Sequence, residues 1–241
     1  MRQRLAPLDG SIHTFARHGA SAQVEGNTAE AFKLALQLGA TGFSASLWST
    51  ADEVAVVHRK ASVGRGLRRH AIAGLTLAEL PPQVLSLHDL YDLIGPDTSL
   101  SLELGGPTAF QAALNETRRQ DNGAEERLWL CSPNRDQLAA WRALTSAKLV
   151  NTTTLARAGM SQEFLAAELR NNDIDGLLLP HHEWSPGLVA VMHRFERYGL
   201  GWGAEHEREM AKLIDSGIDG FYSRHVDRMV AVTAEFTPGQ N

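Results

Sequence analysis

Short apolar runs alternate with amphipathic stretches along the whole chain. Nine apolar runs predict strands, at 13–17, 42–47, 53–58, 99–104, 128–131, 148–151, 176–179, 200–203 and 220–223. Seven stretches with apolar residues three or four positions apart predict helices, at 28–38, 87–94, 109–119, 135–144, 162–170, 186–198 and 207–216. Strands that alternate with helices of this length are typical of parallel βαβ units.

The number of these units favours a closed barrel. A (β/α)8 barrel typically needs about 250 residues, and this chain has 241. We therefore expect residues 1–241 to form a single α/β domain, a (β/α)8 TIM barrel with short loops. A doubly wound open sheet is the alternative architecture.

Three predicted helix-to-strand junctions resemble one another. They read Gly39-Ala-Thr-Gly-Phe43, Asp173-Ile-Asp-Gly-Leu177 and Gly217-Ile-Asp-Gly-Phe221. The Gly before each apolar run permits a tight turn and a close approach of helix to strand. The similarity fits a fold built from repeated βα units, and ordinary turn chemistry without a common origin would explain it as well.

Composition limits the class of protein and its partners. The net charge is −5 and the pI about 6.1, which gives no overall electrostatic case for nucleic acid or an anionic membrane surface. The single Cys131 excludes an internal disulfide and fits a reducing compartment. The N-terminus lacks the apolar run of a signal peptide, and no apolar stretch is long enough for a membrane helix. We expect a soluble, cytoplasmic protein.

Residues 16–59 carry four motifs in a fixed order. They are Ala16-Arg17-His18-Gly19, Glu25-Gly26-Asn27-Thr28, Gly39-Ala-Thr-Gly-Phe-Ser44-Ala-Ser46 and Val56-Val-His58-Arg59. This series resembles the glycerophosphodiester phosphodiesterase family, with its patterns A-H-R-G, E-N-T, G-A-D-x-x-E-x-D and V-x-H-D. Later segments at 75–80, 86–93, 100–104, 130–138, 201–202 and 217–223 resemble further family elements, so the resemblance covers nearly the whole chain.

The resemblance implies a barrel with its site at the carboxyl ends of the strands. The family uses two histidines as general acid and base and a divalent metal to hydrolyse a glycerophosphodiester to glycerol 3-phosphate. His58 corresponds to the second histidine. Arg17 stands at the first, with His18 after it, so His18 could replace the lost histidine only through a rearranged turn at the strand end.

The metal position differs most from the family pattern. The Glu/Asp pair that would hold Mg²⁺ or Ca²⁺ is Ser44 and Ser46 here, and neutral hydroxyls are much poorer ligands for such hard cations. Glu103 remains from the third ligand position, whereas the family's Lys two residues later is Gly105. Ser101 and Glu103 alternate with leucines, so Glu103 should point into the barrel mouth. We expect no metal unless the ancestral activity persists.

Arg17 offers a replacement for the lost positive charge. A buried carboxylate without a partner is costly, so we hypothesise that the Arg17 guanidinium neutralises Glu103. The same guanidinium could hold a phosphate, and stability unchanged in an Arg17→Ala variant would count against the pairing.

Other candidate site residues carry weaker signals. Asn27 could bind ligand, although capping the next helix, with Glu30 three residues on, explains it as well. Trp202 matches a family position beside the glycerol end of the substrate, or packs at the barrel rim. Charged and imidazole side chains at predicted strand ends either line the mouth or are solvated, namely His181, His182, Glu183, Glu205, His206, Arg224 and His225. Arg65, Arg68 and Arg69 lie in the longest irregular region, between His58 and the helix that starts at Leu87, and either meet a phosphate or are solvated.

Three functions remain open from the sequence. In the first, the chain is a glycerophosphodiester phosphodiesterase family member whose degenerate site retains weak or no hydrolysis through His58 and His18. It is alternatively a pseudoenzyme that binds an anionic phosphorylated ligand through Arg17, or a structural barrel with an occluded mouth. Whether it is an enzyme, which alcohol the ligand carries and its oligomeric state stay undetermined, and a small phosphorylated ligand is the expected partner.

Overall fold

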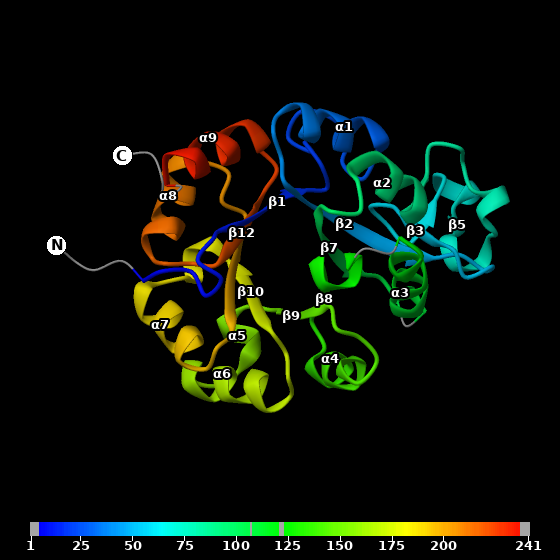
Figure 1. Cartoon of the computed structure of the whole chain (residues 1–241). Helices are drawn as coiled ribbons and strands as arrows, with labels where there is room; N and C mark the ends of the chain where they lie inside the picture. Colours follow the sequence, from blue (N-terminus) through cyan, green and yellow to red (C-terminus); the bar gives the residue numbers. More distant parts are fainter. Residues whose placement is uncertain (1–4, 107, 121–122, 237–241) are drawn as a thin grey trace.

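A computed structural model describes residues 5–106, 108–120 and 123–236, which form a closed parallel barrel surrounded by helices (Figure 1). The barrel strands follow one another in the ring and close where the first pairs with the second. They are β1 (His13–Arg17), β2 (Gly42–Ser49), β7 (Ser99–Leu104), β8 (Leu128–Ser132), β9 (Lys148–Thr152), β10 (Gly176–Pro180), β11 (Tyr198–Trp202) and β12 (Gly220–Ser223). The (β/α)8 barrel predicted from the sequence is confirmed.

Helices cover the outside of the ring and return the chain to the start of each next strand. They are α1 (Ala29–Gln37), α2 (Leu87–Ile94), α3 (Ala109–Arg119), α4 (Arg135–Arg142), α5 (Leu155–Ala158), α6 (Gln162–Asn171), α7 (Pro186–Arg194), α8 (Glu207–Asp215) and α9 (Val226–Phe236). Short 3₁₀ turns are η1 (Gly66–Arg68), η2 (Ile72–Gly74), η3 (Leu77–Glu79), η4 (Ala124–Arg127) and η5 (His181–Glu183).

Polar caps fix where several of these helices begin. The side chains of Ser86, Asn134, Ser161 and Ser185 each accept a backbone N–H three residues on. Such a cap satisfies one of the helix's unpaired N–H groups and stabilises it by about 1 kcal/mol. The helix starts are therefore set locally by the sequence.

Two predicted elements differ in the structure. The helix expected over 186–198 ends at Arg194, because Glu196 adopts a left-handed φ of 55° and Tyr198 already belongs to β11. The strand expected over 53–58 is β3 (Ala55–Val57), which pairs antiparallel with β2 and lies outside the closed ring. A further segment, α9, was not predicted, although its apolar Val226, Met229 and Val232 are buried on one face.

The segment between β3 and α2 makes the longest excursion from the ring. It contains β4 (Ser62–Val63), β5 (His70–Ala71) and β6 (Leu85–Ser86), of which β6 extends the edge formed by β3. Buried Val56, Val63, Ile72 and Leu80 form its small apolar cluster, against which Trp48 packs. This excursion lies beside the barrel rather than within it (Figure 1).

The core has two apolar layers, one inside the barrel and one outside. The inside layer consists of Phe15, Trp129, Cys131, Val150, Leu178, Leu200 and Tyr222, so the barrel is filled rather than open. The outside layer lies between strands and helices and contains the alternate strand residues. Because successive strand side chains face opposite ways, the residues at the strand ends that share the inside face converge on the mouth.

Two of the three similar junctions use an aspartate in the same way. The Asp175 N–H donates to the Leu149 carbonyl and its Oδ2 accepts the Leu149 N–H at 2.7 Å. Likewise, the Asp219 N–H donates to the Gly199 carbonyl and its Oδ2 accepts the Gly199 N–H at 2.6 Å. Thr41 occupies this position in the remaining junction. These aspartates join neighbouring strands at the amino-terminal end of the barrel.

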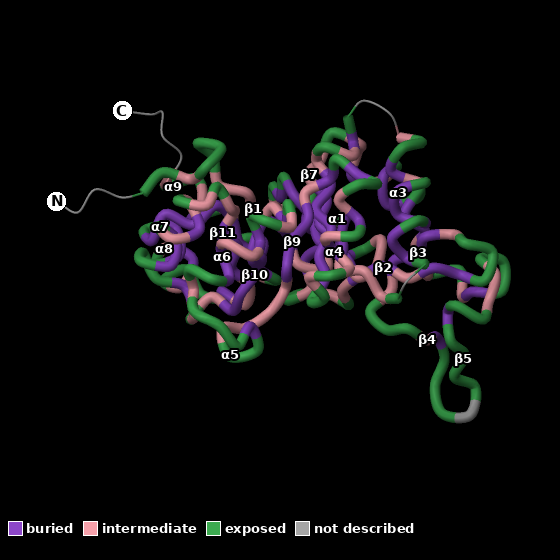
Figure 2. Tube along the Cα trace, turned by 90° about the horizontal axis from the view of Figure 1, so that it is seen from below, coloured by how far each residue is buried: buried purple, intermediate pink, exposed green. Residues whose placement is uncertain are grey.

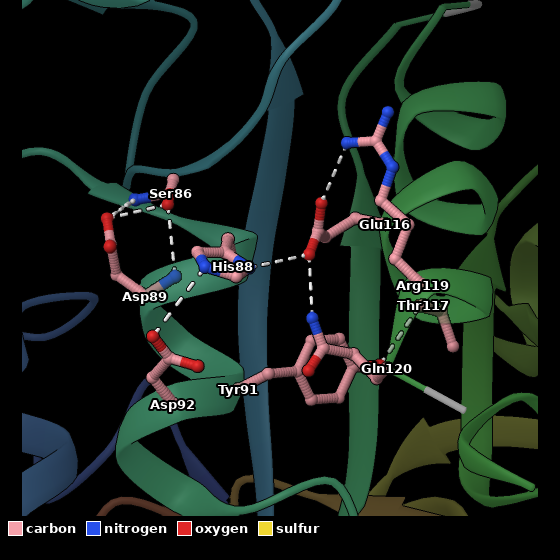
Figure 3. Close-up of polar contacts among 9 residues, drawn as sticks. All are labelled: Ser86, His88, Asp89, Tyr91, Asp92, Glu116, Thr117, Arg119 and Gln120. Carbon is pink, nitrogen blue, oxygen red and sulfur yellow. Dashed lines mark hydrogen bonds and ion pairs between the residues drawn. The ribbon is translucent and has the colours of Figure 1, made fainter. Parts of the chain in front are cut away.

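A surface network joins α2 to α3 (Figure 3). A Glu116 oxygen lies 3.0 Å from His88 Nδ1 and accepts a hydrogen bond from Gln120 at 2.7 Å. The hydrogen bond with Glu116, followed by the Asp92 charge, raises the pKa of His88. Beneath it, the hydroxyls of Tyr91 and Thr117 are 3.0 Å apart. The network holds together the helices that follow the excursion.

Candidate functional site

A cavity of about 620 Å³ opens at the carboxyl ends of the barrel strands. Side chains from β1, β11 and the loops that follow β1, β3, β11 and β12 line it. The lining residues are Arg17, His18, Ser21, Val24, Glu25, Gly26, Arg59, Trp202, Gly203, Glu205 and Arg224. The polar groups gathered here make this cavity the candidate binding site.

Arg17 lies between an anion and an aromatic ring. Its guanidinium is 3.7 Å from the nearer Glu103 oxygen, and its Cζ is 5.2 Å from the centre of the Trp202 ring. A guanidinium at this distance is attracted to the ring face as well as to the carboxylate. Arg17 is therefore oriented before any ligand binds, with a quarter of its side chain (26%) still exposed to the cavity.

His18 reaches the same carboxylate from the turn after β1. The residue has a left-handed φ of 57°, and β1 ends at Arg17, so strand alternation does not extend to it. Its Nε2 lies 3.3 Å from Ser46 Oγ and 3.9 Å from Glu103 Oε2. The turn thus brings consecutive side chains, Arg17 and His18, to one anion.

Glu103 is the anionic centre of this group. Burial, the largest single influence, would raise its pKa, but the nearby His18 imidazole and the Arg17 charge together outweigh it. The pKa of Glu103 is lowered as a result. The carboxylate is therefore ionised at neutral pH and held by cationic or hydrogen-bonding neighbours, while 37% of its side chain remains exposed.

The positions that correspond to the family's metal ligands hold no second carboxylate. Ser44 is fully buried and its hydroxyl has no hydrogen-bond partner among the described residues, whereas the Ser46 hydroxyl contacts His18. Across residues 5–106, 108–120 and 123–236, no three His, Cys, Asp or Glu side chains are grouped so as to hold a metal ion. One carboxylate with two neutral hydroxyls does not fit a hard divalent cation.

Asn27 is a structural clamp at the cavity's edge. The interpretation that it caps the following helix is wrong, because Thr28 is the N-cap and accepts the Ala31 N–H at 3.2 Å. Asn27 instead adopts a left-handed φ of 63°, donates its N–H to the His18 carbonyl and accepts the Ser46 N–H at 3.2 Å. Its Nδ2 is buried and meets no acceptor in the described chain.

His58 lies beside the cavity and is held by backbone contacts. Its Nδ1 is 2.8 Å from the Lys60 carbonyl oxygen, and its own carbonyl accepts the Trp48 indole N–H at 2.8 Å. Among the described residues that line the cavity, Arg59 is present and His58 is not. A catalytic role for His58, and likewise for His18, stays a prediction.

Trp48 is a site-shaping residue that the sequence motifs did not reveal. Its ring lies over Gly105, where an added Cβ would overlap the indole. The sequence could have suggested its place, because Trp48 is two residues beyond Ser46 and therefore lies on the same face of β2. The space that a side chain at position 105 would need is therefore filled.

The remaining strand-end candidates separate into two groups. Glu205 and Arg224 line the mouth and pair at 2.9 Å, while Trp202 presents its ring to Arg17. His181 and His182 line a different cavity of about 440 Å³ with Trp184, between η5 and α8.

Three of the other candidates serve local structure or lie away from the mouth. His206 is the N-cap of α8, and Glu183 accepts the Leu155 N–H at 2.7 Å. Arg65 lies on the excursion after β3 and is exposed.

Several solved structures share this fold. A glycerophosphodiester phosphodiesterase from Thermotoga maritima matches with a TM-score of 0.79 and 20% identity over 92% of this chain and 98% of its own. An Oleispira antarctica phosphodiesterase in complex with sn-glycerol-3-phosphate matches with a TM-score of 0.80 and 18% identity, covering 94% and 98%.

A glycerophosphoryl diester phosphodiesterase candidate from Silicibacter pomeroyi matches with a TM-score of 0.83 and 19% identity, covering 99% and 97%. Neither a protein-family model nor a curated protein sequence matches this chain. At these identities the likenesses establish a shared fold, and function must be argued from the site.

Proposed function

We propose that this chain is a divergent glycerophosphodiester phosphodiesterase relative whose mouth binds a small phosphorylated ligand, with metal-dependent hydrolysis weak or lost. The observation that carries the proposal is Arg17 beside Glu103. A guanidinium supplies the positive charge that a divalent cation would otherwise supply next to this carboxylate. It can hold a phosphate through paired hydrogen bonds, but it does not activate a nucleophile as a bound metal does.

The neighbouring groups support binding of an anion. Arg59 and Arg224 join Arg17 and His18 on the cavity wall, although Arg224 is already paired with Glu205. Trp202 also lines this wall and places its ring against Arg17. A small phosphorylated ligand would bring an anion to these cations, and the sn-glycerol-3-phosphate bound by the Oleispira antarctica phosphodiesterase is a molecule of this chemistry.

Residual catalysis is the competing proposal. It would need His58 and His18 as an acid/base pair, with the glycerophosphodiester between them. The Lys60 backbone contact at His58 Nδ1 and the Ser46 contact at His18 occupy one nitrogen of each ring. The other nitrogen of each ring could still transfer a proton, so the case for binding over turnover rests instead on Ser44 and Ser46, which replace a pair of carboxylates. A mouth that binds nothing would indicate a structural barrel.

Location and organisation are part of the proposal. Cys131 is buried and unpaired, which fits a reducing compartment such as the cytoplasm. In the part of the chain that the structure describes, no helix combines the length and apolar character needed to cross a bilayer. We take residues 1–241 to act as one barrel domain.

Calorimetric titration and a hydrolysis assay test the proposed function together. Glycerophosphocholine and glycerol 3-phosphate would each be titrated into the wild type, an Arg17→Gln variant and an Arg157→Gln variant, the last an exposed arginine remote from the cavity. We expect binding that Arg17→Gln weakens roughly 10- to 100-fold, the range for a charged hydrogen bond, and that Arg157→Gln leaves unchanged.

Release of glycerol 3-phosphate would be followed with Mg²⁺, with Ca²⁺ and with chelator, in wild type and His58→Ala. Turnover that is lost in both the chelator and the variant would show a working metal site and overturn the proposal. Absence of both binding and turnover would leave the structural barrel.

A further inference from the structure

Residues 58–71, which we call the basic arm, concentrate positive charge on a protruding hairpin. The segment contains five Lys or Arg and two His but no Asp or Glu, in a chain whose net charge is −5. Its strands β4 and β5 pair antiparallel over two residues, Ser62 with Ala71 and Val63 with His70. Figure 2 shows this hairpin extending away from the barrel, mostly exposed.

The arm's cations make no ion pair within the described residues. Arg59, Lys60, Arg65, Arg68 and Arg69 are all exposed, and none is paired with an acidic side chain that the structure describes. The Arg69 Nε donates to the Ser62 hydroxyl at 2.6 Å, which is a neutral acceptor. Like charges on one short segment repel one another, so an anionic partner would lower the energy of the arm.

The base of the arm is rigidly attached. Buried Val63 and Ile72 insert into the cluster with Val56 and Leu80, and the Ile72 N–H donates to the Ala61 carbonyl. Gly64 has a left-handed φ of 82° and has no room for a Cβ against the Arg68 carbonyl. The hairpin that carries the cations is therefore anchored to the excursion by its buried base.

The arm begins at the barrel mouth. Arg59 lines the cavity that contains Arg17 and His18, and the His58 N–H donates to the Ser46 carbonyl at the end of the barrel wall. An anionic surface that contacts the arm therefore also lies next to the cavity entrance.

We propose that the basic arm docks the protein on an anionic phospholipid surface. A plane of phosphate-bearing headgroups can contact cations that are spread along both limbs of a hairpin, and each cation near such a surface strengthens binding. Leu77, at the base of the excursion and 38% exposed, adds an apolar contact. The net charge of the whole chain does not reveal this surface, because it sums the positive arm with the negative charge of the other residues.

The composition of the arm favours lipid over single-stranded nucleic acid. Proteins of the latter class stack bases on aromatic side chains, and residues 58–71 contain no Phe, Tyr or Trp. The inference is independent of the proposed function, because it concerns where the protein sits and not what the mouth binds.

Vesicle co-sedimentation of the full chain tests the docking. Phosphatidylcholine vesicles would be compared with vesicles that contain about 30 mol% phosphatidylglycerol, at low and at physiological salt. We expect binding to the anionic vesicles only, weaker at higher salt, and reduced roughly 100-fold by the triple variant Arg65→Gln, Arg68→Gln, Arg69→Gln.

A matched variant separates the arm from general charge. Lys33→Gln, Arg157→Gln and Arg208→Gln remove the same charge from exposed positions elsewhere, and should bind vesicles as the wild type does. Three outcomes would each overturn the proposal. They are an equal loss of vesicle binding in both triple variants, no binding of the wild type to anionic vesicles at low salt, and binding to a single-stranded oligonucleotide in place of vesicles. Glycerophosphocholine titration of the arm variant should match the wild type, so a failure of docking is distinguishable from a failure of the proposed function.

Discussion

The two ends of the barrel treat buried polar groups in opposite ways. At the amino-terminal end, Asp219 is fully buried and accepts the Gly199 and Leu8 N–H groups at 2.6 and 2.7 Å, while His193 lies 3.0 Å away. At the mouth, Ser44 Oγ, Asn27 Nδ2 and Trp202 Nε1 are buried without a hydrogen-bond partner among the described residues.

This difference predicts unequal contributions of the two ends to stability. A buried polar group stabilises the fold only when its hydrogen bonds are made, and an unmade bond costs about 1–3 kcal/mol. At the closed end, the hydrogen bonds of Asp219 are made and join β12 to β1 and β11. At the open end, the three buried atoms make no hydrogen bond within the described residues, so they should contribute little to stability or lower it.

The strongest test of the closed end is an Asp219→Ala variant. It removes the acceptor of two backbone N–H groups and the partner of His193, leaving buried donors unpaired. We expect a loss of about 3–5 kcal/mol in the free energy of unfolding, measured by urea denaturation. Asp215→Ala, at an exposed position of α8, is the control and should change stability by less than about 0.5 kcal/mol.

The second junction should behave similarly but more weakly. Asp175 accepts the Leu149 N–H and pairs with Arg142 at 2.9 Å, yet 28% of its side chain is exposed. Water can replace part of what is lost, so Asp175→Ala should cost about 1–3 kcal/mol in the same denaturation experiment. A cost equal to that of Asp219→Ala would mean that burial does not set the difference between them.

At the mouth, Ser44→Ala should leave stability unchanged or raise it by up to about 1 kcal/mol. The substitution removes a buried hydroxyl that has no hydrogen-bond partner in the described chain and leaves the apolar Cβ in place. Urea denaturation without ligand provides the measurement. A destabilisation above about 1 kcal/mol would show that the hydroxyl is engaged in the free protein and would remove the contrast between the two ends.

The smallest expected effect concerns the pH dependence of stability. The pKa of Glu103 in the folded chain is lowered from 4.5. Its ionisation thus stabilises the fold above that value, and the contribution is lost as pH falls through the lower folded pKa. Glu103→Gln should reduce the dependence of unfolding free energy on pH between about 5 and about 3. The exposed part of the side chain keeps the change modest, and an unaltered pH profile would contradict the ion pair with Arg17.

The pattern of apolar residues predicted the barrel better than the ends of its elements. Strand interiors consist of continuous apolar runs, which the sequence shows directly. The end of α7 depends on the left-handed conformation of Glu196, which the spacing of apolar residues does not predict. Residues 55–57 of the run at 53–58 are extended as predicted, but their antiparallel pairing with β2 is set by a turn, so the pattern could not exclude this strand from the ring.

The site was predictable where alternation alone decides direction. Glu103 faces inward because it follows the inward Ser101, and this placement suggested the Arg17 contact. The position of His18 depends on the left-handed turn after β1, and that of Trp48 on the absence of a side chain at Gly105. Such details arise from backbone geometry and packing rather than from residue type.

The Trp48 ring over Gly105 also limits which side chains can be introduced into the site. A lysine at position 105 would have to displace an indole that is bonded to the His58 carbonyl and packed against the base of the arm. Replacing Trp48 with a smaller residue would make room but would also loosen that base. A new charge at position 105 therefore cannot be introduced independently, because the packing of Trp48 couples the cavity to the excursion beside it.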